Sequence, residues 1–404
     1  MATSWIQIPE RSPFSIDTLP YGIFSVHDED ARVGVAIGEH VLDLAPLAAE
    51  ENLDGAHVFA QGSLNPFMAL GKRAWAAVRG WLFELLTEEP HRDLVERHLV
   101  PLTEVHLHLP FEVSDFVDFY SSQYHAENVG RIFRPDSPGL PGAWRHLPIG
   151  YHGRAGTVVP SGTDIVRPCG LRPNGEIVAY GPSAKLDIEA EVGFVVGVRS
   201  AMGRPVPVSD FTEHVFGVVL VNDWSARDIQ AFEYVPLGPF LGKSFATSIS
   251  SWVVPLAALD HARVEPPTRQ PEPAEYLRDA DTKPWGLEID LEVSWNGTTV
   301  SRPPFAHMYW TAAQQLAHLT ANGASVRSGD LYASGTVSGP APDQRGSFLE
   351  LTWNGTQPVV LDDGSTREFL ADGDTVTISA TAPGPNGSRV GFGEVTGTVL
   401  PALD

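Results

Sequence analysis

The chain contains little cysteine and little positive charge. Its 404 residues include a single cysteine, Cys169, so no disulfide can form within the chain and no metal site can be built from several thiolates. Lysine and arginine number 27 against 50 aspartate and glutamate residues, a formal net charge of −23. A chain this acidic has no general attraction for nucleic-acid phosphates or anionic lipid, so we expect neither as a partner. An anionic substrate would need local cations or a bound metal.

Long hydrophobic runs are also missing. No run approaches the roughly 18 apolar residues that span a bilayer. The segment MATSWIQIPERSPF lacks the basic region and apolar core of a secretory signal, so we expect a cytoplasmic protein without membrane partners. The apolar fraction of 43% and the charged fraction of 19% are ordinary for a globular protein.

The chain divides into two regions of different texture, with a boundary near residue 112. Region 1–112 predicts short strands over 21–26, 33–37 and 40–44. It also predicts a helix over 70–87, where apolar residues recur every three or four positions. Region 113–404 is dense in glycine and proline. We expect a mostly β protein whose second region is a large, mostly antiparallel β domain.

Secondary structure in the second region is predicted mainly from short apolar runs. Strands are expected over 116–120, 157–159, 188–198, 215–221, 287–295, 348–353, 359–361, 375–381 and 394–400. Only two helices are expected, over 124–133 and 309–321. The Asn-Gly pairs after Trp295 and Trp353 are typical of two-residue hairpin turns. Residues 265–284, rich in proline and glutamate, predict a long surface excursion.

Polar residues concentrate after one apolar run. Residues 215–221 are apolar apart from Gly217, which is typical of a strand buried on both faces. An acid, two cations, an amide and a phenol follow in close succession: Asp223, Arg227, Gln230, Tyr234 and Lys243. A buried strand that delivers such groups to its end predicts the floor of an active site.

Three carboxylates alternate along the preceding predicted strand, in KLDIEAEVGFVVGV. Residues two apart on a strand share a face, so Asp187, Glu189 and Glu191 should point the same way. The strand becomes apolar on both faces after Glu191, and buried carboxylates repel each other unless a cation joins them. A hard divalent metal is one interpretation, and a site without metal is the other.

A second triad provides a comparison. Glu288, Asp290 and Glu292 have the same spacing in LEIDLEVSW. There the alternation stays strict to the end of the strand, so we expect these acids to face water.

Two histidines compete as the general base. His125 lies in DFVDFYSSQYHAENVGRIFR, close to an acid, a phenol and a guanidinium: Asp118, Tyr120 and Arg134. His152 lies between glycines in LPIGYHGRAGTVVPSG. Farther along, LYASGTVSGP and GSFLEL supply Thr336 and Glu350. A carboxylate between two leucines needs a partner, and a catalytic histidine would be a natural one.

Together these stretches resemble the fumarylacetoacetase family. The sequences DFYSSQYHAENVGRIFR, GYHGRAGTVV, LDIEAEVGFVVG, NDWSARDIQAFEYVPLGPFLGKSFATS, LYASGTVSGP with GSFLEL, and RVGFGEVTGTVLPAL occur in the family's order. The resemblance is strong over about 110–404 and looser over the first hundred residues. It implies an SH3-like N-terminal domain over 1–112, a mixed catalytic β-roll over 113–404, and a homodimer.

The resemblance also implies roles for individual residues. Ligands of a divalent cation, usually calcium or magnesium, are implied at Asp118, Glu189, Glu191 and Asp223. A second, structural magnesium is implied near Lys243 and Thr247. His125 matches the base that activates water, and Glu350 matches the carboxylate that orients it. Donors to the developing negative charge are implied at Arg227, Gln230 and Lys243. Substrate-binding positions are implied at Tyr120, Arg134, Gln230, Tyr234 and Thr336.

The activity implied by the resemblance is hydrolysis of the carbon–carbon bond of 4-fumarylacetoacetate to fumarate and acetoacetate. This is the last step of tyrosine and phenylalanine catabolism, carried out by metal-assisted attack of histidine-activated water. One alternative is another metal-dependent hydrolase or a decarboxylase of the same fold, acting on a related β-keto acid. A second alternative is a metal-binding β scaffold without catalysis, in which His125→Ala would change no activity.

Overall fold

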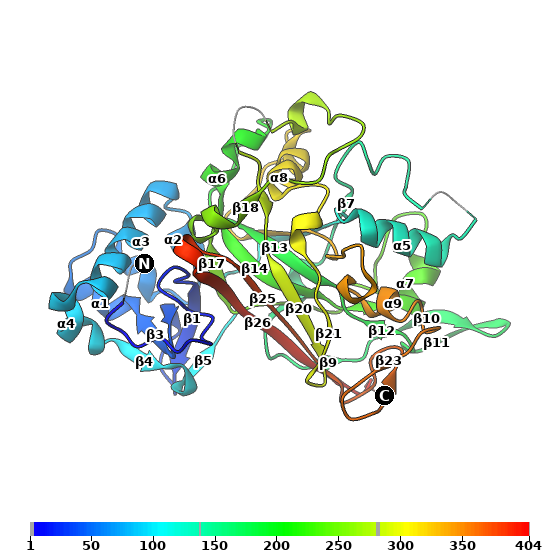
Figure 1. Ribbon diagram of the computed structural model, residues 1–404, viewed down its shortest axis with the longest axis horizontal. Coiled ribbons are helices and arrows are strands. Elements are labelled where there is room, and N and C mark those ends of the chain that lie inside the picture. The colour runs from blue at the N-terminus through cyan, green and yellow to red at the C-terminus, as the bar shows by residue number, and fades with distance from the viewer. Residues whose placement is uncertain (1–3, 137–138, 280–282, 404) are drawn as a thin grey trace.

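A computed structural model describes residues 4–136, 139–279 and 283–403 and confirms a mostly β protein. The N-terminal unit, blue in Figure 1, contains the strands β1 (Tyr21–Val26), β2 (Arg32–Ile37), β3 (His40–Asp43), β4 (Leu99–Pro101) and β5 (Val105–Leu107). Its helices are α1 (Leu44–Glu50), α2 (Asn65–Met68), α3 (Lys72–Thr87) and α4 (Arg92–Glu96). The three predicted strands and the predicted helix are all present.

The strands of the N-terminal unit continue into the main sheet of the molecule. That sheet follows the order β4-β3-β2-β1-β17-β14-β13-β22-β6-β7, with β5, β8 and β16 beside this path. Its further members are β6 (Asp115–Phe119), β7 (Gly150–His152), β8 (Val158–Pro160), β13 (Ala190–Val196), β14 (Val215–Asp223), β16 (Thr247–Ile249), β17 (Trp252–Pro255) and β22 (Asp330–Ala333). Most pairs are antiparallel, whereas β8 with β16 and β6 with β22 are parallel.

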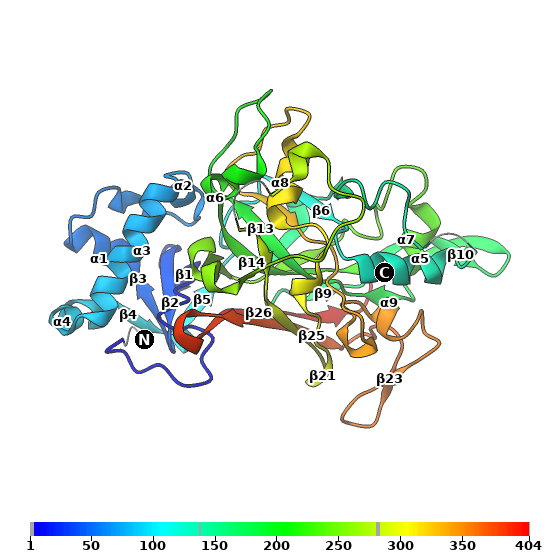
Figure 2. The same ribbon diagram turned by 45° about the horizontal axis from the view of Figure 1, so that its top comes forward.

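A second sheet crosses the middle of the molecule (Figures 1 and 2). Its order is β21-β20-β25-β26-β9, from the strands β9 (Ile165–Val166), β20 (Asp290–Trp295), β21 (Thr298–Ser301), β25 (Thr375–Pro383) and β26 (Arg389–Leu400). Four short pairs are β10 (Cys169–Asn174) with β11 (Ile177–Pro182), β12 (Leu186–Asp187) with β15 (Ser225–Ala226), β18 (Arg263–Val264) with β19 (Gly286–Leu287), and β23 (Val359–Val360) with β24 (Thr366–Arg367). The remaining helices are α5 (Gln123–Phe133), α6 (Phe211–His214), α7 (Arg227–Glu233), α8 (Ala312–Thr320) and α9 (Phe348–Leu351). Within the described residues, none of the helices is both long and apolar enough to cross a membrane.

Strand β14 is buried along its whole length because it separates two cores. Val218 and Leu220 pack in the core of the second region. Val219 and Val221 pack in a core that also holds Tyr21 and other side chains of the N-terminal unit. Successive side chains of a strand point to opposite faces, so both faces must be apolar. The predicted doubly buried strand is confirmed, and it extends to Asp223.

Two predicted hairpin turns have different outcomes. The turn after Trp295 joins β20 to β21, with positive φ angles of 50° at Asn296 and 82° at Gly297. The turn after Trp353 does not follow a strand. The prediction of a strand over 348–353 is wrong, because this segment begins with helix α9. Among the described residues, six short helices escaped prediction because none exceeds 7 residues, too few to show a helical period: α1, α2, α4, α6, α7 and α9.

The predicted strand over 188–198 is shorter than expected. Ile188 and Glu189 lie between β12 and β13 and belong to neither strand. The excursion over 265–284 is mostly exposed or half-buried, although Leu277 is fully buried. Residues 280–282 of this segment lie outside the described residues.

Candidate active site

Strand register places three carboxylates on one face of the main sheet. Residues two apart on a strand share a face, and so do residues directly opposite each other on paired strands. Each acid therefore shares its orientation with an apolar residue of the core common to the two regions: Asp223 with Val221, Asp118 with Phe116, and Glu191 with Val195. The same rule brings Thr247 beside Asp223 and Tyr151 beside Asp118.

These carboxylates form a buried acidic cluster with Glu189. Carboxylate oxygens of Asp118, Glu189 and Asp223 lie within 4.8 Å of one another. Lys243 bridges two of the acids, because its Nζ lies 2.5 Å from Oε2 of Glu189 and 2.9 Å from Oδ2 of Asp223. All of these side chains, and Glu191 as well, are buried.

The pKa values of the acids in the acidic cluster are shifted in opposite directions. Burial raises the pKa of Asp118 and of Glu191 well above the usual range, and neighbouring carboxylates add to the rise. Burial also raises the pKa of Asp223, although Lys243 opposes the rise. For Glu189 burial is outweighed by Lys243 and Arg227, so its pKa is lowered. The neighbouring cations thus stabilise the ionised form of Glu189. They do not balance the negative charge that the other acids would carry when ionised.

The acidic cluster fits a divalent cation. Within the described residues, Oδ1 of Asp118 and both carboxylate oxygens of Glu191 are buried without a hydrogen-bond partner. Buried carboxylate oxygens without partners are costly, and a hard cation with oxygen ligands would satisfy them. The cluster is therefore a possible acidic metal site.

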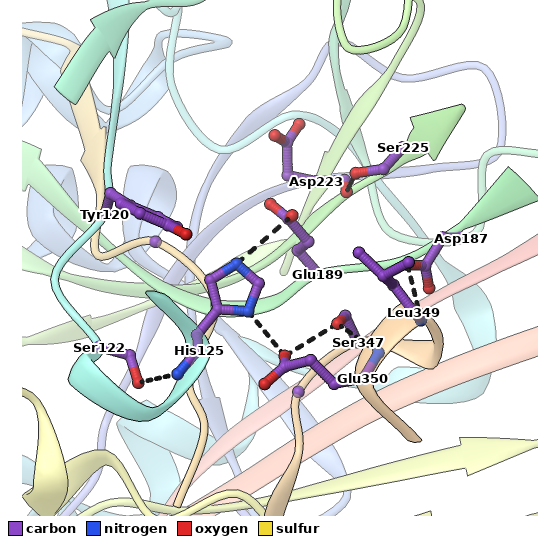
Figure 3. A network of polar contacts seen from close by, with 12 residues as sticks. Tyr120, Ser122, His125, Asp187, Glu189, Asp223, Ser225, Ser347, Leu349 and Glu350 are labelled. Carbon is purple, nitrogen blue, oxygen red and sulfur yellow. Dashed lines mark hydrogen bonds and ion pairs between the residues drawn. The ribbon is translucent and has the colours of Figure 1, made fainter. Parts of the chain in front are cut away.

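His125 lies at the edge of the acidic cluster and contacts Glu350 (Figure 3). Its Nδ1 lies 2.6 Å from Oε2 of Glu350, and its Nε2 lies 4.0 Å from Oε1 of Glu189. Burial alone would raise the pKa of Glu350, but His125, Asn128 and Ser347 lower it below its usual value. Because the ionised carboxylate only accepts hydrogen bonds, Nδ1 is the donor and Nε2 is left as an acceptor.

Local structure fixes both members of the His125–Glu350 pair. Ser122 caps helix α5, and its hydroxyl accepts from the backbone N–H of His125 at 3.3 Å. Ser347 caps α9 in the same way and also donates to Glu350 at 2.9 Å. Ser338 donates to the same carboxylate at 3.0 Å. The predicted pairing of Glu350 with a catalytic histidine thus has the required geometry, although Glu350 lies on a helix.

Asp187 lies apart from the acidic cluster, which corrects the expectation that three alternating acids face one way. Its carboxylate accepts from the backbone N–H groups of Phe348 and Leu349, at 2.7 and 3.0 Å, and from Nε of Arg227 at 2.7 Å. The break between β12 and β13 ends the alternation between Asp187 and Glu189. Asp187 therefore holds the start of α9 and one side of Arg227.

Arg227 links Asp187 to the acidic cluster. It lies at the start of α7, and its second contacts are Oε1 of Glu189 at 2.8 Å and Oε1 of Gln230 at 3.1 Å. Within the described residues its Nη2 is buried without a partner. Arg227 therefore keeps the N–H groups of Nη2 free, and the amide nitrogen of Gln230 remains available as a donor.

The predicted substrate-binding residues lie at several elements around this centre. The ring of Tyr120 lies 5.4 Å from that of His125, edge to face. Arg134 ends helix α5 and Tyr234 ends α7, both half-buried. Thr336 is buried, and its hydroxyl has no hydrogen-bond partner among the described residues.

The structure identifies further residues of the site that the sequence did not single out for a role. The hydroxyl of Tyr151 donates to Oδ2 of Asp223 at 3.2 Å, beside Thr247, a residue that the resemblance did single out and whose hydroxyl donates to Oδ1 at 2.8 Å. Asn128 donates to Oε1 of Glu350 at 2.9 Å. Asn128 lies three positions after His125, one helical turn, which could have indicated it. The competing His152 is exposed.

A pocket of about 140 Å³ opens on the acidic cluster. Asp223, Lys243, Thr247 and Tyr151 line it, together with Phe240 from the loop after α7. His125 is not among its lining residues. The pocket therefore reaches the cluster from the side of Asp223.

The second acidic triad behaves as predicted. Glu288 and Asp290 are exposed, and Glu292 is half-buried beside Arg302, with 3.0 Å between Nη2 and the carboxylate. The same spacing of acids thus gives solvent-facing side chains around β20 and buried side chains around β13.

Two family models match nearly the whole chain. The model described as fumarylacetoacetate (FAA) hydrolase C-terminal matches residues 116–400, and the model described as fumarylacetoacetase N-terminal matches residues 17–110. The fumarylacetoacetase of Rattus norvegicus is 46% identical over 422 residues, covering 99% of each chain.

Solved structures share the fold at low sequence identity. A fumarylacetoacetate hydrolase from the psychrophilic Exiguobacterium antarcticum has a TM-score of 0.55 at 18% identity, covering 95% of this chain and 100% of that one. A maleylpyruvate hydrolase from Sphingobium sp. SYK-6, in complex with manganese(II) ion and pyruvate, has a TM-score of 0.53 at 13% identity, with the same coverage.

Proposed function

The chain belongs to the fumarylacetoacetase family, and from this premise we propose that it hydrolyses 4-fumarylacetoacetate to fumarate and acetoacetate. The enzyme is a hydrolase acting on a carbon–carbon bond, in the last step of tyrosine and phenylalanine catabolism. The observation that carries the proposal is the His125–Glu350 pair, which leaves a histidine nitrogen 4.0 Å from an acid of the buried cluster. Such a gap suits a bridging water.

His125 acts as the general base in this proposal. Its Nε2 takes a proton from water, and the hydroxide oxygen forms a bond to one carbonyl carbon of the 1,3-diketone. The bond from that carbon to the neighbouring methylene then breaks, and its electron pair leaves as an enolate. The proton held at Nε2 is available for the methylene carbon. Glu350 keeps Nδ1 protonated throughout and stabilises the imidazolium.

Three donors would meet the negative charge that develops. Arg227 offers its free Nη2, and Gln230 offers its amide nitrogen because its oxygen already accepts from Arg227. Lys243 is held between Glu189 and Asp223, so its role is partly to position these acids. Fixed donors in a buried site are the larger part of such stabilisation.

A divalent cation, calcium or magnesium, would be held by Asp118, Glu189, Glu191 and Asp223. The support is the set of unpartnered carboxylate oxygens together with the raised pKa values of three of these acids. When bound, the cation would polarise the diketone oxygens as a Lewis acid. We further propose a second, structural magnesium near Lys243 and Thr247, supported by the contacts of both residues with Asp223.

The substrate carboxylate would form an ion pair with Arg134 and accept hydrogen bonds from the hydroxyls of Tyr120 and Tyr234. Thr336 offers a further hydroxyl that is buried and unpartnered among the described residues. Local cations of this kind let a chain with a net charge of −23 bind an anion.

We also propose an SH3-like domain over 1–112, a catalytic β-roll over 113–404, and a homodimer. A face for the second copy is the β10–β11 hairpin, which projects from the molecule (Figures 1 and 2) and exposes Ile177 by 64% and Tyr180 by 71%. The hairpin packs on α7 through Gly170, where a side chain would meet Ile229. Ile177→Lys would then yield monomers in analytical ultracentrifugation.

A cytoplasmic location also stays a prediction.

The purified protein, loaded with magnesium or calcium, should be given fumarylacetoacetate and oxaloacetate in separate assays. We expect equimolar fumarate and acetoacetate from the first substrate, detected by proton NMR, and no carbon dioxide from the second. Decarboxylation of oxaloacetate without cleavage of fumarylacetoacetate would favour the alternative, a decarboxylase of the same fold.

A further inference from the structure

A second and larger pocket lies far from the acidic cluster in the fold, between the N-terminal unit and the second region. Its volume is about 330 Å³, within the range of small-molecule sites. Its walls come from β1, α3, α6, β14 and the segments around Pro255 and Trp285. It shares no lining residue with the pocket beside Asp223. No step of the proposed reaction uses it.

Aromatic rings form much of the pocket wall. The rings of Trp75 and Phe216 meet edge to face at 5.3 Å, and Tyr21 meets Phe216 at 5.6 Å. Trp285 also lines the pocket, and the guanidinium of Arg263 lies 4.1 Å from the centroid of its ring. Flat apolar walls of this kind favour a planar aromatic guest.

Cations outnumber acids around the pocket. Lys72 pairs with Glu213 at 2.7 Å, and Arg263 lies 4.0 Å from Asp260. Arg79 donates to the backbone carbonyl oxygens of Thr18 and Asp17, at 3.1 and 2.5 Å. Within the described residues it has no carboxylate within 4.0 Å; the side chain of Asp17 acts on it only at longer range. Arg79 is thus a half-buried charge without a close counter-ion.

Tyr21 provides the second observation. It lines the pocket and is 1% exposed, yet its hydroxyl has no hydrogen-bond partner among the described residues. A buried hydroxyl without a partner costs free energy that a guest could recover. Arg79 lines the same pocket and acts electrostatically on this hydroxyl, so a carboxylate bound to Arg79 would offer it an acceptor.

We propose that this pocket binds a small aromatic monocarboxylate. Its ring would lie against Trp75 and Trp285, and its carboxylate would accept from Arg79 and from the hydroxyl of Tyr21. The carboxylate would supply both the missing counter-ion and the missing acceptor. Because α3 belongs to the N-terminal unit and Phe216 to β14, the bound molecule would stabilise the junction of the two regions.

The test uses phenylacetate as the probe and phenylacetamide as its neutral counterpart of the same shape, in calorimetric titrations of the full chain. We expect phenylacetate to bind and to raise the melting temperature, and phenylacetamide to bind at least about tenfold more weakly. Arg79→Gln should weaken phenylacetate by a similar factor, and Tyr21→Phe by a smaller one. Arg73→Gln is the matched control, because Arg73 is exposed on the same helix.

Three results would overturn the proposal. The first is no binding of phenylacetate to the wild-type protein. The second is equal affinity for phenylacetate in Arg79→Gln, checked to be folded by its near-ultraviolet circular dichroism. The third is strict competition of phenylacetate with fumarylacetoacetate at unchanged strength in Arg79→Gln, which would place the probe in the active site. Hydrolase activity of Arg79→Gln itself should stay at the wild-type level.

Discussion

Nδ1 of His125 lies 2.6 Å from Oε2 of Glu350, and both side chains are almost completely withdrawn from solvent. The contact joins helix α5 to helix α9, 225 positions apart in the chain. Three further donors reach the same carboxylate, from Asn128, Ser338 and Ser347. The carboxylate is thus held ionised and fixed in place, and it selects the histidine tautomer in which Nε2 accepts a proton.

Replacing Glu350 with glutamine should lower kcat by on the order of 10²-fold or more. The glutamine amide can donate to Nδ1, which favours the tautomer with the proton on the wrong nitrogen. Steady-state rates across pH measure the effect. Glu394→Gln is the control, since Glu394 is exposed on β26. Unchanged kcat in Glu350→Gln would contradict the tautomer argument.

His125→Ala should abolish measurable turnover, a loss of roughly 10² to 10⁴ in rate, while the bound metal is retained. The reason is that His125 lies beside the acidic cluster without belonging to it. Elemental analysis of the dialysed protein gives the metal content. His152→Ala, which removes the exposed histidine, should leave the rate unchanged. Loss of metal together with activity in His125→Ala would make the histidine a ligand.

Asp223→Ala should lose metal and activity together, because Asp223 joins the acids of β6 and the segment before β13 around one point. Metal stoichiometry after gel filtration and the rate with added magnesium provide the measurement. A variant that keeps one equivalent of metal would remove Asp223 from the ligand set. Glu292→Gln, in the solvated triad, should bind metal like the wild type.

Asp187→Asn tests whether Asp187 acts apart from Glu189 and Glu191, the two other acids of the triad predicted from the sequence. It should keep the metal and still lower both turnover and stability, because Asp187 holds Arg227 and two backbone N–H groups of α9. Breaking a buried charged contact of this kind costs about 3–5 kcal/mol. Chemical unfolding and metal analysis on the same preparation test both statements. Metal loss in Asp187→Asn would restore Asp187 to the cluster.

Asp374 predicts a pH dependence of stability away from the active site. Burial would raise its pKa, but hydrogen bonds from Asn296, Ala371, Arg367 and Trp295 lower it overall. A lowered pKa means that the contribution to stability is present above the unfolded value near 4 and disappears as the pH falls through the folded value. Asp374→Asn should therefore cost about 1–3 kcal/mol at neutral pH and progressively less in acid.

Urea unfolding at several pH values measures this difference, with the exposed Asp362→Asn as the control. A cost that stays constant down to the acid transition would show that Asp374 acts by shape and not by charge.

The family resemblance implied the grouping of Asp118, Glu191 and Asp223, and strand alternation accounts for it in the structure because all three acids lie on strands. Asp223 follows a run buried on both faces, and parity then places it with Asp118 and Glu191. The same reasoning failed for Asp187, because alternation holds only while the strand is continuous, and two residues outside the strands follow β12.

Glu350 shows a second limit of predicting structure from the sequence. Its neighbours Leu349 and Leu351 resemble a strand, yet the segment is a helix of 4 residues. One of the groups that stabilises its first turn is the carboxylate of Asp187, 161 positions away from Phe348. A contact so distant leaves no local period in the sequence, so the helix was not predictable, although the pairing of Glu350 with a histidine was.

The junction of β1 with β17 makes the first hundred residues a cover for the catalytic region. Tyr21 and Gly22 of β1 pair with Val253 and Trp252 of β17, and the cores on either side are continuous. A fragment lacking the N-terminal unit would expose β17 as an open sheet edge beside an uncovered apolar surface. Open edges of this kind recruit further strands from other chains. The N-terminal unit therefore protects the catalytic region from aggregation as well as completing its fold.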